Sequence, residues 1–304
     1  MRAVTVTGFG AEPEVTDQPV PEPGPGEVLV RLTAAGLNPF DWKVVDGAIP
    51  SVRFPLTIGT DGAGTVERVG ADVTGFQPGD AVFGQFSNAK EGRGSYAELA
   101  VARQDAIAAA PRTVALSEAA AVPTAGMTAL NLVDRVAEAG AGRLLVVGAT
   151  GGVGTFATQL AAARGIAVVA TAGPDKADLM HALGATEVVD HTAGPIADQV
   201  EAPVDAIIDL ASDTERLRAL LPAIRPGGTI LSPVFAVPDE GLPGVEAANF
   251  SNASSADLLE RLAREIDAGH VRVVIGDTVT LSQAPDALAR SRAGRARGKT
   301  VIVI

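Results

Sequence analysis

The sequence predicts an α/β protein with two regions, one β-rich and irregular, the other a doubly wound parallel sheet. Three observations carry this prediction. The first third of the 304 residues contains short strands and loops without a βα order. From about Ser117, helical segments alternate with buried apolar strands, as in doubly wound proteins. A glycine-rich turn, "GATGGVG" at Gly148–Gly154, joins one of these strands to the next helix.

The first region is predicted from alternation and from turn residues. Glu27–Leu37, "EVLVRLTAAGL", alternates like a strand and follows a loop rich in proline and glycine at Pro21–Glu27. Gly64–Gly70 and Gly79–Gln85 are expected to be further short strands, separated by the turn "TGFQPGD".

The second region alternates between helices and strands along its whole length. Its expected elements are, in order, helix Glu118–Val136, strand Leu144–Ala149, helix Thr155–Gly165, strand Ala167–Ala172, helix Lys176–Ala185, strand Glu187–Asp190, strand Ala206–Leu210, helix Arg216–Ile224 and strand Gly228–Pro233. The tail after Ala256 carries one clear helix, Asp257–Gly269, and a last strand, Thr300–Ile304.

The glycine-rich turn predicts a site for a dinucleotide. A helix that begins directly after such a turn points free backbone N–H groups at a pyrophosphate. In the usual spacing of three glycines, the positions here are Ala149, Gly151 and Gly154. Gly151 would let the backbone approach the phosphates, and Gly154 would let the helix pack close to the strand. The alternative is a turn with only a structural role.

Composition favours a cytoplasmic enzyme. The formal net charge of −12 and the pI near 4.7 argue against nucleic acid or an anionic membrane as the main partner. No stretch is apolar for long enough to span a bilayer, and "MRAVTVTGFG" lacks the core of a signal peptide.

Cysteine is absent and histidine is rare. The sequence has no cysteine, which excludes disulfides, thiol nucleophiles and thiolate zinc sites. Its three histidines, His181, His191 and His270, are widely spaced. We therefore expect no metal centre.

The sequence resembles the zinc-free quinone oxidoreductases of the medium-chain dehydrogenase/reductase superfamily. The resemblance extends over essentially the whole chain and depends on the order and spacing of its motifs. These are "GEVLVRLTAAGLNPFDW", "IGTDGAGTV", "GDAVFG", "GSYAEL", "PTAGMTAL", "GATGGVG", "LGATEVVD", "IRPGGTI" and "RGKTVIVI".

The resemblance implies a fold and a domain division. It predicts a GroES-like β-domain formed by residues 1–117 and 252–304, with a Rossmann nucleotide domain, residues 118–251, inserted between them. Zinc-dependent relatives carry Cys and His where this chain has Asn38 and Pro39, and His and Glu where it has Thr60 and Asp61. The active site is expected between the two domains and without zinc.

The residue inventory favours conjugated carbonyl substrates. A nicotinamide cofactor carries the hydride, and the protein need only hold an acceptor over it and exclude water. A quinone or an α,β-unsaturated carbonyl accepts hydride with modest polarisation, whereas a simple ketone usually needs a strong acid. We therefore predict an NADPH-dependent quinone oxidoreductase. The alternatives are an enoyl-thioester reductase of the same superfamily and a non-catalytic NADPH-binding protein.

Two residues are the catalytic candidates, and two aromatic residues are the candidates for binding the substrate. Asn38 matches an asparagine beside the nicotinamide in the family, or it is a turn residue before Pro39. Asp41 would polarise the substrate or relay a proton, or cap a helix that begins at Trp42. Trp42 and Phe54 would form an aromatic wall, or belong to the core. Tyr96, the only tyrosine, is predicted to be a packed ring in a strand rather than a proton donor.

Cofactor choice is predicted from the end of the strand Ala167–Ala172. An NAD site usually has an acidic residue there, whereas an NADP site has small residues and supplies positive charge. The strand ends in small residues up to Gly173, and the resemblance places Lys176, His191 and Arg295 on residues that bind the 2′-phosphate side of NADPH. Asp175 argues against NADPH, because it would lie near the ribose, where its carboxylate could oppose a 2′-phosphate or accept a 2′-hydroxyl. The alternative is that Asp175 and Lys176 are only the solvated start of a helix.

The remaining cofactor contacts come from the turn and from the family comparison. The full set of expected cofactor-binding residues is Thr128, Ala149, Thr150, Gly151, Gly152, Val153, Gly173, Lys176, His191, Pro233, Val234 and Arg295. Pro233 and Val234 are included because they correspond to the family's cofactor-contacting strand end.

The sequence also predicts a homodimer. Nucleotide sheets in this family commonly pair edge to edge. Gly228–Pro238, "GTILSPVFAVP", is apolar and is expected to be the terminal strand of its sheet, where an exposed edge would favour pairing.

Overall fold

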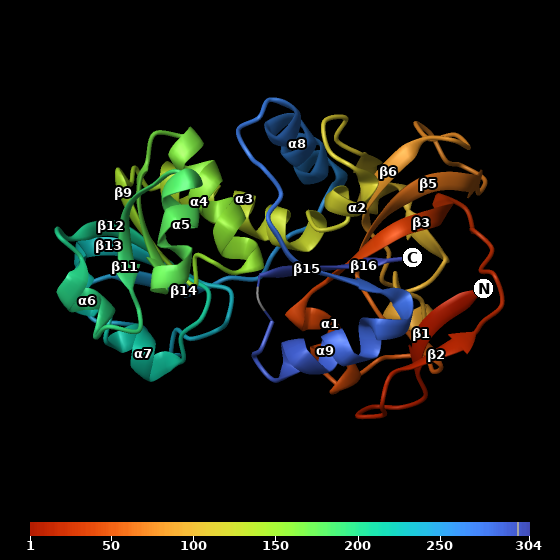
Figure 1. Cartoon of the computed structure of the whole chain (residues 1–304), viewed down its shortest axis with the longest axis horizontal. Helices are drawn as coiled ribbons and strands as arrows, with labels where there is room; N and C mark the ends of the chain where they lie inside the picture. The colour runs from red at the N-terminus through yellow and green to blue at the C-terminus, as the bar shows by residue number, and fades with distance from the viewer. Residues whose placement is uncertain (297) are drawn as a thin grey trace. The chain divides into compact units, whose positions relative to one another are not determined.

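The computed structural model describes residues 1–296 and 298–304. The chain divides into two compact units, coloured by residue number in Figure 1. Unit 1 consists of Met1–Ala125 and Ser254–Ile304, and unit 2 is the segment between them, Gly126–Ala253. The sequence prediction divides the chain after residues 117 and 251.

Unit 1 is mainly β-structure with short helices. Its elements are β1 (Arg2–Val6), β2 (Glu14–Asp17), β3 (Glu27–Leu37), α1 (Pro39–Val45), β4 (Leu56–Thr57), β5 (Asp61–Val69), β6 (Ala81–Gln85), η1 (Ala89–Glu91), β7 (Leu99–Arg103), η2 (Gln104–Ala106), β8 (Ile107–Ala109), α2 (Leu116–Ala119), α8 (Ala256–Asp267), β15 (Ile275–Thr280), η5 (Leu281–Gln283), α9 (Ala284–Arg292) and β16 (Lys299–Val303), where η marks a 3-10 turn.

The strands of unit 1 form two sheets. The smaller sheet has the order β2-β1-β4, and the larger has the order β15-β16-β3-β5-β6-β8, with β7 also paired to β3. β16 pairs antiparallel with β3, so that Val301 lies opposite Gly36. The segment after unit 2 thus completes the sheet that the first 109 residues begin. This pairing brings Lys299 to the end of β3.

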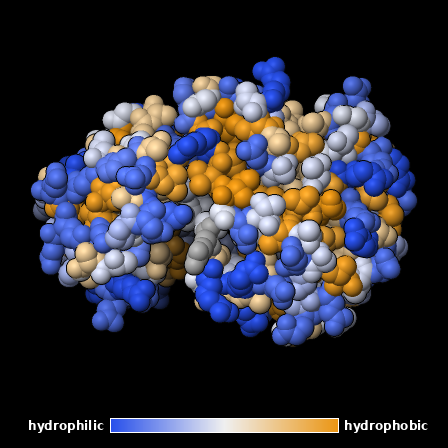
Figure 2. All heavy atoms as spheres, in the orientation of Figure 1, coloured by the Kyte–Doolittle hydropathy of each residue, from blue (hydrophilic) through white to orange (hydrophobic). Residues whose placement is uncertain are grey.

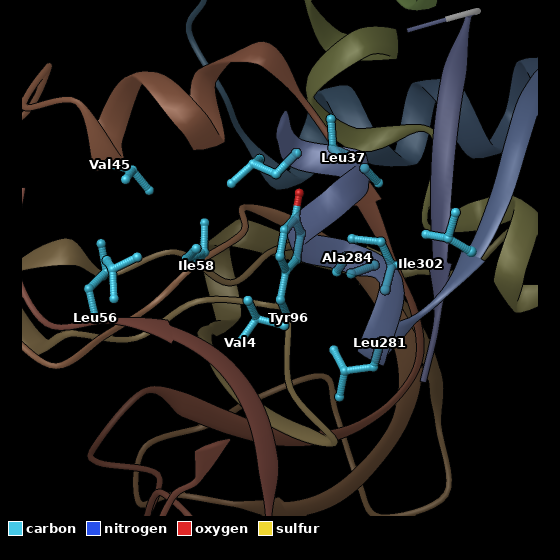
Figure 3. Close-up of a cluster of buried hydrophobic side chains, with 14 residues drawn as sticks. Val4, Leu37, Val45, Leu56, Ile58, Tyr96, Leu281, Ala284 and Ile302 are labelled. Atoms are coloured by element: carbon cyan, nitrogen blue, oxygen red, sulfur yellow. The ribbon is translucent and has the colours of Figure 1, made fainter. Parts of the chain in front are cut away.

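One core cluster of unit 1 surrounds the ring of Tyr96 (Figure 3). Its members include Val4 from β1, Ile58, Leu281 and Ile302 from β16. Tyr96 is completely buried and lies in a bend before β7, not in a strand as the sequence predicts. A buried aromatic ring of this size contributes heavily to a core, which agrees with the prediction of a packed ring.

Unit 2 alternates helices and strands, as predicted. Its elements are α3 (Pro123–Glu138, whose first three residues belong to unit 1), β9 (Arg143–Val147), α4 (Gly152–Ala163), β10 (Ala167–Ala172), η3 (Pro174–Lys176), α5 (Ala177–Ala182), β11 (Ala185–Asp190), α6 (Ile196–Gln199), β12 (Val204–Asp209), α7 (Thr214–Arg218), η4 (Leu221–Ala223), β13 (Ile224–Ser232) and β14 (Glu246–Asn249).

The sheet of unit 2 is parallel and doubly wound. Its strand order is β11-β10-β9-β12-β13-β14, and all neighbouring strands are parallel. From β9, the chain first adds strands toward one edge, to β11, and then crosses over to add β12, β13 and β14 on the other side of β9. This is the order of Rossmann folds, and ligands bind where the strand order reverses in this way, outside the carboxyl ends of the strands. Leu144, Leu145 and Val146 of β9 are fully buried, as expected for a strand covered on both faces.

The edge of this sheet differs from the prediction. Gly228–Pro238 is not the terminal strand, because β13 pairs with β12 on one side and with β14 on the other. The terminal strand is β14, whose sequence "EAAN" carries no apolar run. The prediction of an apolar edge strand at Gly228–Pro238 was therefore wrong, and the homodimer prediction can no longer be based on this segment.

The tail also holds more structure than predicted. Helix α8 and strand β16 were expected, but α9 and β15 were not.

Figure 2 shows a largely hydrophilic surface with hydrophobic side chains gathered in patches. Across the described residues, no helix has both the length and the apolar character that a bilayer span requires.

Candidate active site

In unit 2, a tight turn joins β9 to α4 at the carboxyl end of the sheet. Gly148 has φ +79°, in the left-handed region that suits glycine. Its N–H donates to Thr171 Oγ1 of β10 at 2.9 Å, which ties the turn to the neighbouring strand. The left-handed glycine is therefore Gly148, and Ala149, the expected first position of the motif, is a fully buried residue beside it.

Gly154 and Gly151 differ in the space around them. A Cβ on Gly154 would lie 2.4 Å from the carbonyl oxygen of Gly148 and 2.6 Å from Ala149 Cα. Only glycine permits this approach of α4 to the turn. A Cβ on Gly151 would meet a single atom, Gly148 O, at 3.3 Å. A side chain at position 151 thus needs only a small shift of the turn, far less than one at position 154, which agrees with a role of Gly151 in the approach to a ligand.

The start of α4 fits a pyrophosphate. Gly151 is its N-cap, and Gly152 and Val153 follow as its first residues. All three are partly accessible. The first N–H groups of a helix have no intrahelical partner and attract anions. Thr150 precedes the N-cap and is also partly accessible.

The ends of β10 and β11 lie side by side. Ala172 pairs with Asp190, so that Gly173 and His191 follow at the same edge of the sheet. Lys176 and His191 are exposed. Asp175 Oδ1 lies 3.1 Å from where a Cβ on Gly173 would be, so this carboxylate lies over the strand end. This edge of the sheet therefore carries a cation, Lys176, directly after a carboxylate, Asp175, in the sequence.

The other expected cofactor residues are placed as follows. Thr128 lies in α3 and is buried. Pro233 and Val234 follow β13 directly, and Val234 is exposed. Arg295 belongs to unit 1, where it is exposed in the turn after α9 and lines a cavity with Arg290 and Asp277.

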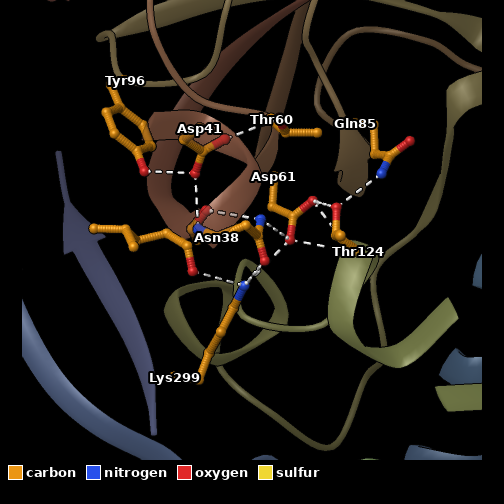
Figure 4. Close-up of polar contacts among 10 residues, drawn as sticks. Asn38, Asp41, Thr60, Asp61, Gln85, Tyr96, Thr124 and Lys299 are labelled. Atoms are coloured by element: carbon orange, nitrogen blue, oxygen red, sulfur yellow. Dashed lines mark hydrogen bonds and ion pairs between the residues drawn. The ribbon is translucent and has the colours of Figure 1, made fainter. Parts of the chain in front are cut away.

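In unit 1, a buried ion pair joins β5 to β16. Asp61 is completely buried and Lys299 is 4% exposed. Lys299 Nζ lies 3.3 Å from Asp61 Oδ2 and donates to Asn38 Oδ1 at 2.6 Å and to the carbonyl oxygen of Leu37 at 3.1 Å. Asn38 Nδ2 in turn donates to Asp61 Oδ2 at 2.8 Å. Figure 4 shows these three side chains converging.

The second oxygen of Asp61 faces the start of α3. The Thr124 hydroxyl donates to Asp61 Oδ1 at 2.5 Å, and its backbone N–H lies 3.0 and 3.1 Å from the two carboxylate oxygens. Gln85 Nε2 donates to Thr124 Oγ1 at 2.8 Å. Every buried charge of this group is thus paired and hydrogen-bonded, as a low-dielectric interior requires.

Asp41 lies next to this ion pair and accepts three hydrogen bonds. Its Oδ2 accepts from the backbone N–H of Asn38 at 2.7 Å and from the Tyr96 hydroxyl at 2.8 Å, and its Oδ1 accepts from Thr60 Oγ1 at 3.0 Å. Helix α1 begins at Pro39, so that Asp41 caps it from its third position rather than from before Trp42. Capping and a chemical role are therefore compatible.

Burial is the largest influence on Asp41 and raises its pKa to about 6. The negative charge of Asp61 raises this pKa further, whereas the hydrogen bonds from Asn38 and Tyr96 and the charge of Lys299 lower it. Burial, together with the neighbouring Asp41 charge, raises the pKa of Tyr96 well above its ordinary value, so Tyr96 stays a donor. Asp41 alone of these two exchanges a proton near neutral pH.

Asp41 and Thr60 line a pocket of about 270 Å³ within unit 1. Its apolar lining comes from Phe40, Val44, Ile49, Leu56 and Ile58. We call it the Phe40 pocket. Phe40 is 42% exposed, so its ring is accessible to a molecule that enters the pocket.

Trp42 and Phe54 do not line the Phe40 pocket. Trp42 packs against the core and lines a separate cavity beside α9. Phe54 packs edge to face on Phe9, with 5.2 Å between the two ring centroids. The aromatic residue of the pocket is therefore Phe40, two positions before Trp42. Residues two apart on a helix point in different directions, and the aromatic residues predicted from the sequence are Trp42 and Phe54, with core packing as the alternative, but not Phe40.

The donor set of unit 1 does not fit a zinc ion. Asn38, Thr60 and Asp61 offer oxygen atoms rather than the sulfur and imidazole ligands that zinc prefers. The Lys299 ammonium already binds the oxygens of Asn38 and Asp61. Among residues 1–296 and 298–304, no group of three or more His, Cys, Asp or Glu side chains could hold a metal ion.

The structure adds residues that sequence reasoning did not assign to the site. Thr60, Asp61 and Lys299 all contact the catalytic candidates Asn38 or Asp41. The Tyr96 hydroxyl donates to Asp41 Oδ2, a contact that the sequence does not predict. A signal was present for Lys299, since it is the charged residue that opens an otherwise apolar strand in "RGKTVIVI".

Comparisons with known proteins agree with this architecture. The family model for an alcohol dehydrogenase GroES-like domain matches residues 24–112, within unit 1. A model for a zinc-binding dehydrogenase matches residues 183–302.

Similar proteins cover most or all of the chain. It is 32% identical to the chloroplast envelope quinone oxidoreductase homolog of Arabidopsis thaliana, with 99% of this chain and 98% of that protein covered. It is 31% identical to the trans-enoyl reductase himH of Aspergillus japonicus, with coverage of 88% and 79%. The crystal structure of an NAD-dependent alcohol dehydrogenase matches over 100% of both chains, with a TM-score of 0.90 and 30% identity. The chain therefore belongs to the medium-chain dehydrogenase/reductase superfamily and is an oxidoreductase of its quinone oxidoreductase-like branch.

Proposed function

We propose that the protein transfers a hydride from NADPH to a quinone or another conjugated carbonyl, without zinc. The observation that carries the proposal is the Phe40 pocket, whose apolar wall adjoins polar side chains, among them the Thr60 hydroxyl and the Asp41 carboxyl. Such a wall suits a flat apolar acceptor, and the two polar groups supply the modest polarisation that a conjugated carbonyl needs.

Unit 2 would hold the cofactor. The first N–H groups of α4, after Gly151, suit the pyrophosphate, and the strand ends at Gly173 and His191 suit the ribose side. When bound, the dihydronicotinamide supplies the hydride. The residues of unit 1 then have two tasks, which are to hold the acceptor against an apolar wall and to provide a proton.

The buried ion pair would keep the catalytic candidates in position. Lys299 and Asp61 fix the amide of Asn38 from both sides, and the N–H of Asn38 fixes Asp41. A group that is held by several hydrogen bonds loses little entropy when it meets a substrate.

A substrate panel tests the proposal. NADPH oxidation should be measured with benzoquinones, naphthoquinones, simple enones, 2-enoyl thioesters and saturated ketones. We expect turnover with quinones or enones and at least a hundredfold lower kcat/KM with saturated ketones, as differential transition-state binding would produce. Equal activity with saturated ketones would contradict the proposal, and NADPH binding without turnover of any acceptor would favour a binding protein.

An enoyl-thioester reductase is the second candidate. Its support is the likeness to himH and the presence of Lys90 and Arg93 in the Phe40 pocket. Arg93, however, is paired with Glu27 and Glu91, each at 3.1 Å, which leaves less positive charge for a carrier phosphate. A kcat/KM for 2-enoyl thioesters above that for quinones would favour this candidate.

We further propose that NADPH is preferred over NADH, and Lys176 provides the test. Lys176→Ala should lower kcat/KM for NADPH at least about tenfold and leave that for NADH nearly unchanged, because a charge-assisted hydrogen bond to the 2′-phosphate contributes roughly 1.5–3 kcal/mol. Both values, and the dissociation constants, should be measured with the same quinone.

The control for Lys176 is Arg216→Ala, which removes another exposed cation of unit 2. This variant should keep the wild-type preference. A wild type that prefers NADH would show that Asp175, which lies over the end of β10, governs the choice instead. An unchanged preference in Lys176→Ala would also defeat the assignment.

Zinc independence gives another prediction. Dialysis against EDTA should leave full activity, and elemental analysis should find no stoichiometric zinc, because Lys299 rather than a metal binds the oxygens of Asn38 and Asp61. Activity that falls on chelation and returns with added zinc would refute this expectation.

A homodimer remains part of the proposal, now with β14, which is one of the two edge strands of the unit 2 sheet with β11, as the edge proposed for pairing. The exposed Val234 and Phe235, which follow β13, lie outside the strands and offer apolar surface for such a contact.

A further inference from the structure

Two polar side chains reach the Phe40 pocket from different parts of the chain. Asp41 belongs to α1 and Thr60 precedes β5, and both line the pocket. Thr60 Oγ1 donates to Asp41 Oδ1 at 3.0 Å. In Figure 4, Thr60 lies on one side of the carboxyl and Tyr96 on the other. A titratable group thus has a hydroxyl beside it at the pocket wall.

The protonation state of Asp41 decides what the Thr60 hydroxyl can do. A hydroxyl has one hydrogen to donate and can also accept. While Asp41 is ionised, its Oδ1 takes the hydrogen of Thr60. When Oδ1 carries a proton, the carboxyl donates to Thr60 Oγ1, and the hydrogen of Thr60 is released toward an acceptor in the pocket. Thr60 is therefore a donor to a bound molecule when Asp41 is protonated.

The other oxygen of Asp41 is held by permanent donors. Oδ2 accepts from the Asn38 N–H at 2.7 Å and from the Tyr96 hydroxyl at 2.8 Å. Neither donor titrates near neutral pH, since one is a backbone amide and burial raises the pKa of Tyr96. These contacts would hold the carboxylate that remains after a proton has left.

The charged groups around Asp41 are of both signs. Asp61 of β5 raises its pKa and Lys299 of β16 lowers it, while burial is the largest influence and brings the pKa to about 6. Lys90 and Arg93 line the same pocket. Both protonation states are therefore accessible between about pH 5 and 7, where a general acid works best.

We propose that Thr60 and Asp41 form a proton relay, in which the Thr60 hydroxyl protonates the reduced acceptor and Asp41 reprotonates Thr60. The inference rests on the proposed hydride transfer, which leaves the acceptor with an extra electron pair and a negative charge. The O–H bond of Thr60 breaks as the acceptor takes the proton, and the O–H bond of Asp41 breaks as Thr60 Oγ1 takes the next one. Asp41 remains as a carboxylate and is reprotonated from solvent, so the acceptor gains one hydride and one proton.

The test compares Thr60→Val, which keeps the shape but removes the hydroxyl, with Thr60→Ser, which keeps the hydroxyl. For each, kcat and its solvent deuterium isotope effect should be measured from pH 5 to 9 with a quinone that the wild type reduces. An α-substituted enone adds a second measurement, because its reduced α-carbon is a stereocentre. Infrared spectra of Asp41→Asn and wild type, recorded at both ends of this pH range, identify the carboxyl band of Asp41 without any turnover.

The relay predicts distinct results for the two variants. In the wild type and Thr60→Ser, kcat should be highest below about pH 6 and should fall above it, since the acid form of Asp41 is then lost. Thr60→Val should lose roughly a hundredfold in kcat, together with this pH dependence and the solvent isotope effect. With the enone, Thr60→Val should give both α-epimers, because water then protonates from either face.

Three outcomes separate the failures. If the wild type reduces acceptors and Thr60→Val keeps its rate, pH profile and product stereochemistry, the relay is wrong and the proposed function stands. If the Asp41 carboxyl band does not change between pH 5 and 9, the relay is also wrong. If the wild type reduces no acceptor, the proposed function fails first, and the relay has no reaction to serve.

Discussion

Lys299→Met should lower the free energy of unfolding by about 3–5 kcal/mol, because it leaves a buried carboxylate without its cation. Asp61 is completely buried, and Lys299 Nζ is its cationic contact at 3.3 Å. The variant also removes the donor of the 2.6 Å hydrogen bond to Asn38. Urea denaturation followed by circular dichroism measures the loss.

Two further variants show whether the charge is the cause. Lys90→Met removes an exposed lysine of the same unit and should change stability by less than about 0.5 kcal/mol. Lys299→Met combined with Asp61→Asn removes both charges and should recover part of the loss, since no ion is then left unpaired. If Lys299→Met alone has the same midpoint of urea denaturation as the wild type, the ion pair between Lys299 and Asp61 does not stabilise unit 1.

Gly154→Ala should disrupt unit 2 and abolish nucleotide binding. The added Cβ would lie 2.4 Å from Gly148 O and 2.6 Å from Ala149 Cα, so the turn or α4 must move. Overpacking of this kind costs about 1–3 kcal/mol or more, and the displaced N–H groups no longer face a pyrophosphate. Thermal denaturation and calorimetric titration with NADPH measure the two effects.

Gly151→Ala is the matched control for that substitution. Its Cβ would meet only Gly148 O, at 3.3 Å, so the variant should melt within a few degrees of the wild type. Its affinity for NADPH should still fall, because the methyl group stands where the backbone is expected to approach the phosphates. Loss of stability in both variants, or in neither, would argue against the separate roles given to the two glycines.

The local features of unit 2 could be predicted from the sequence. β9 and β10 are mostly apolar, with "LLVV" in β9 and "AVVA" in β10, and the glycine-rich turn between β9 and α4 is a local signal. β14 could not be predicted, because "EAAN" has neither apolar alternation nor β-branched residues and is a strand only through its pairing with β13.

The site in unit 1 depended on contacts that are distant in the sequence. Asn38 and Asp41 could be identified because they lie within one motif. For Lys299 the only signal was its place at the start of an apolar strand, and its contact with the site could not be predicted, since lysine is rarely buried and its partner Asp61 lies 238 positions away. The choice of Phe40 over Trp42 as the aromatic residue of the pocket depended on the direction in which α1 turns each side chain.

The discontinuous sheet of unit 1 has a consequence for synthesis on the ribosome. Unit 2 is one continuous segment, so all of its strands have been made once Asn249 has emerged. β3, by contrast, waits for β16, whose residues come more than 260 positions later than Leu37. Until then the Ala34–Leu37 end of β3 is unpaired on the side that β16 will occupy, although β7 already pairs with Glu27–Arg31, and Asp61 lacks its cation. The nascent protein therefore carries a finished nucleotide unit beside an open sheet, and this interval is when it most needs protection by chaperones.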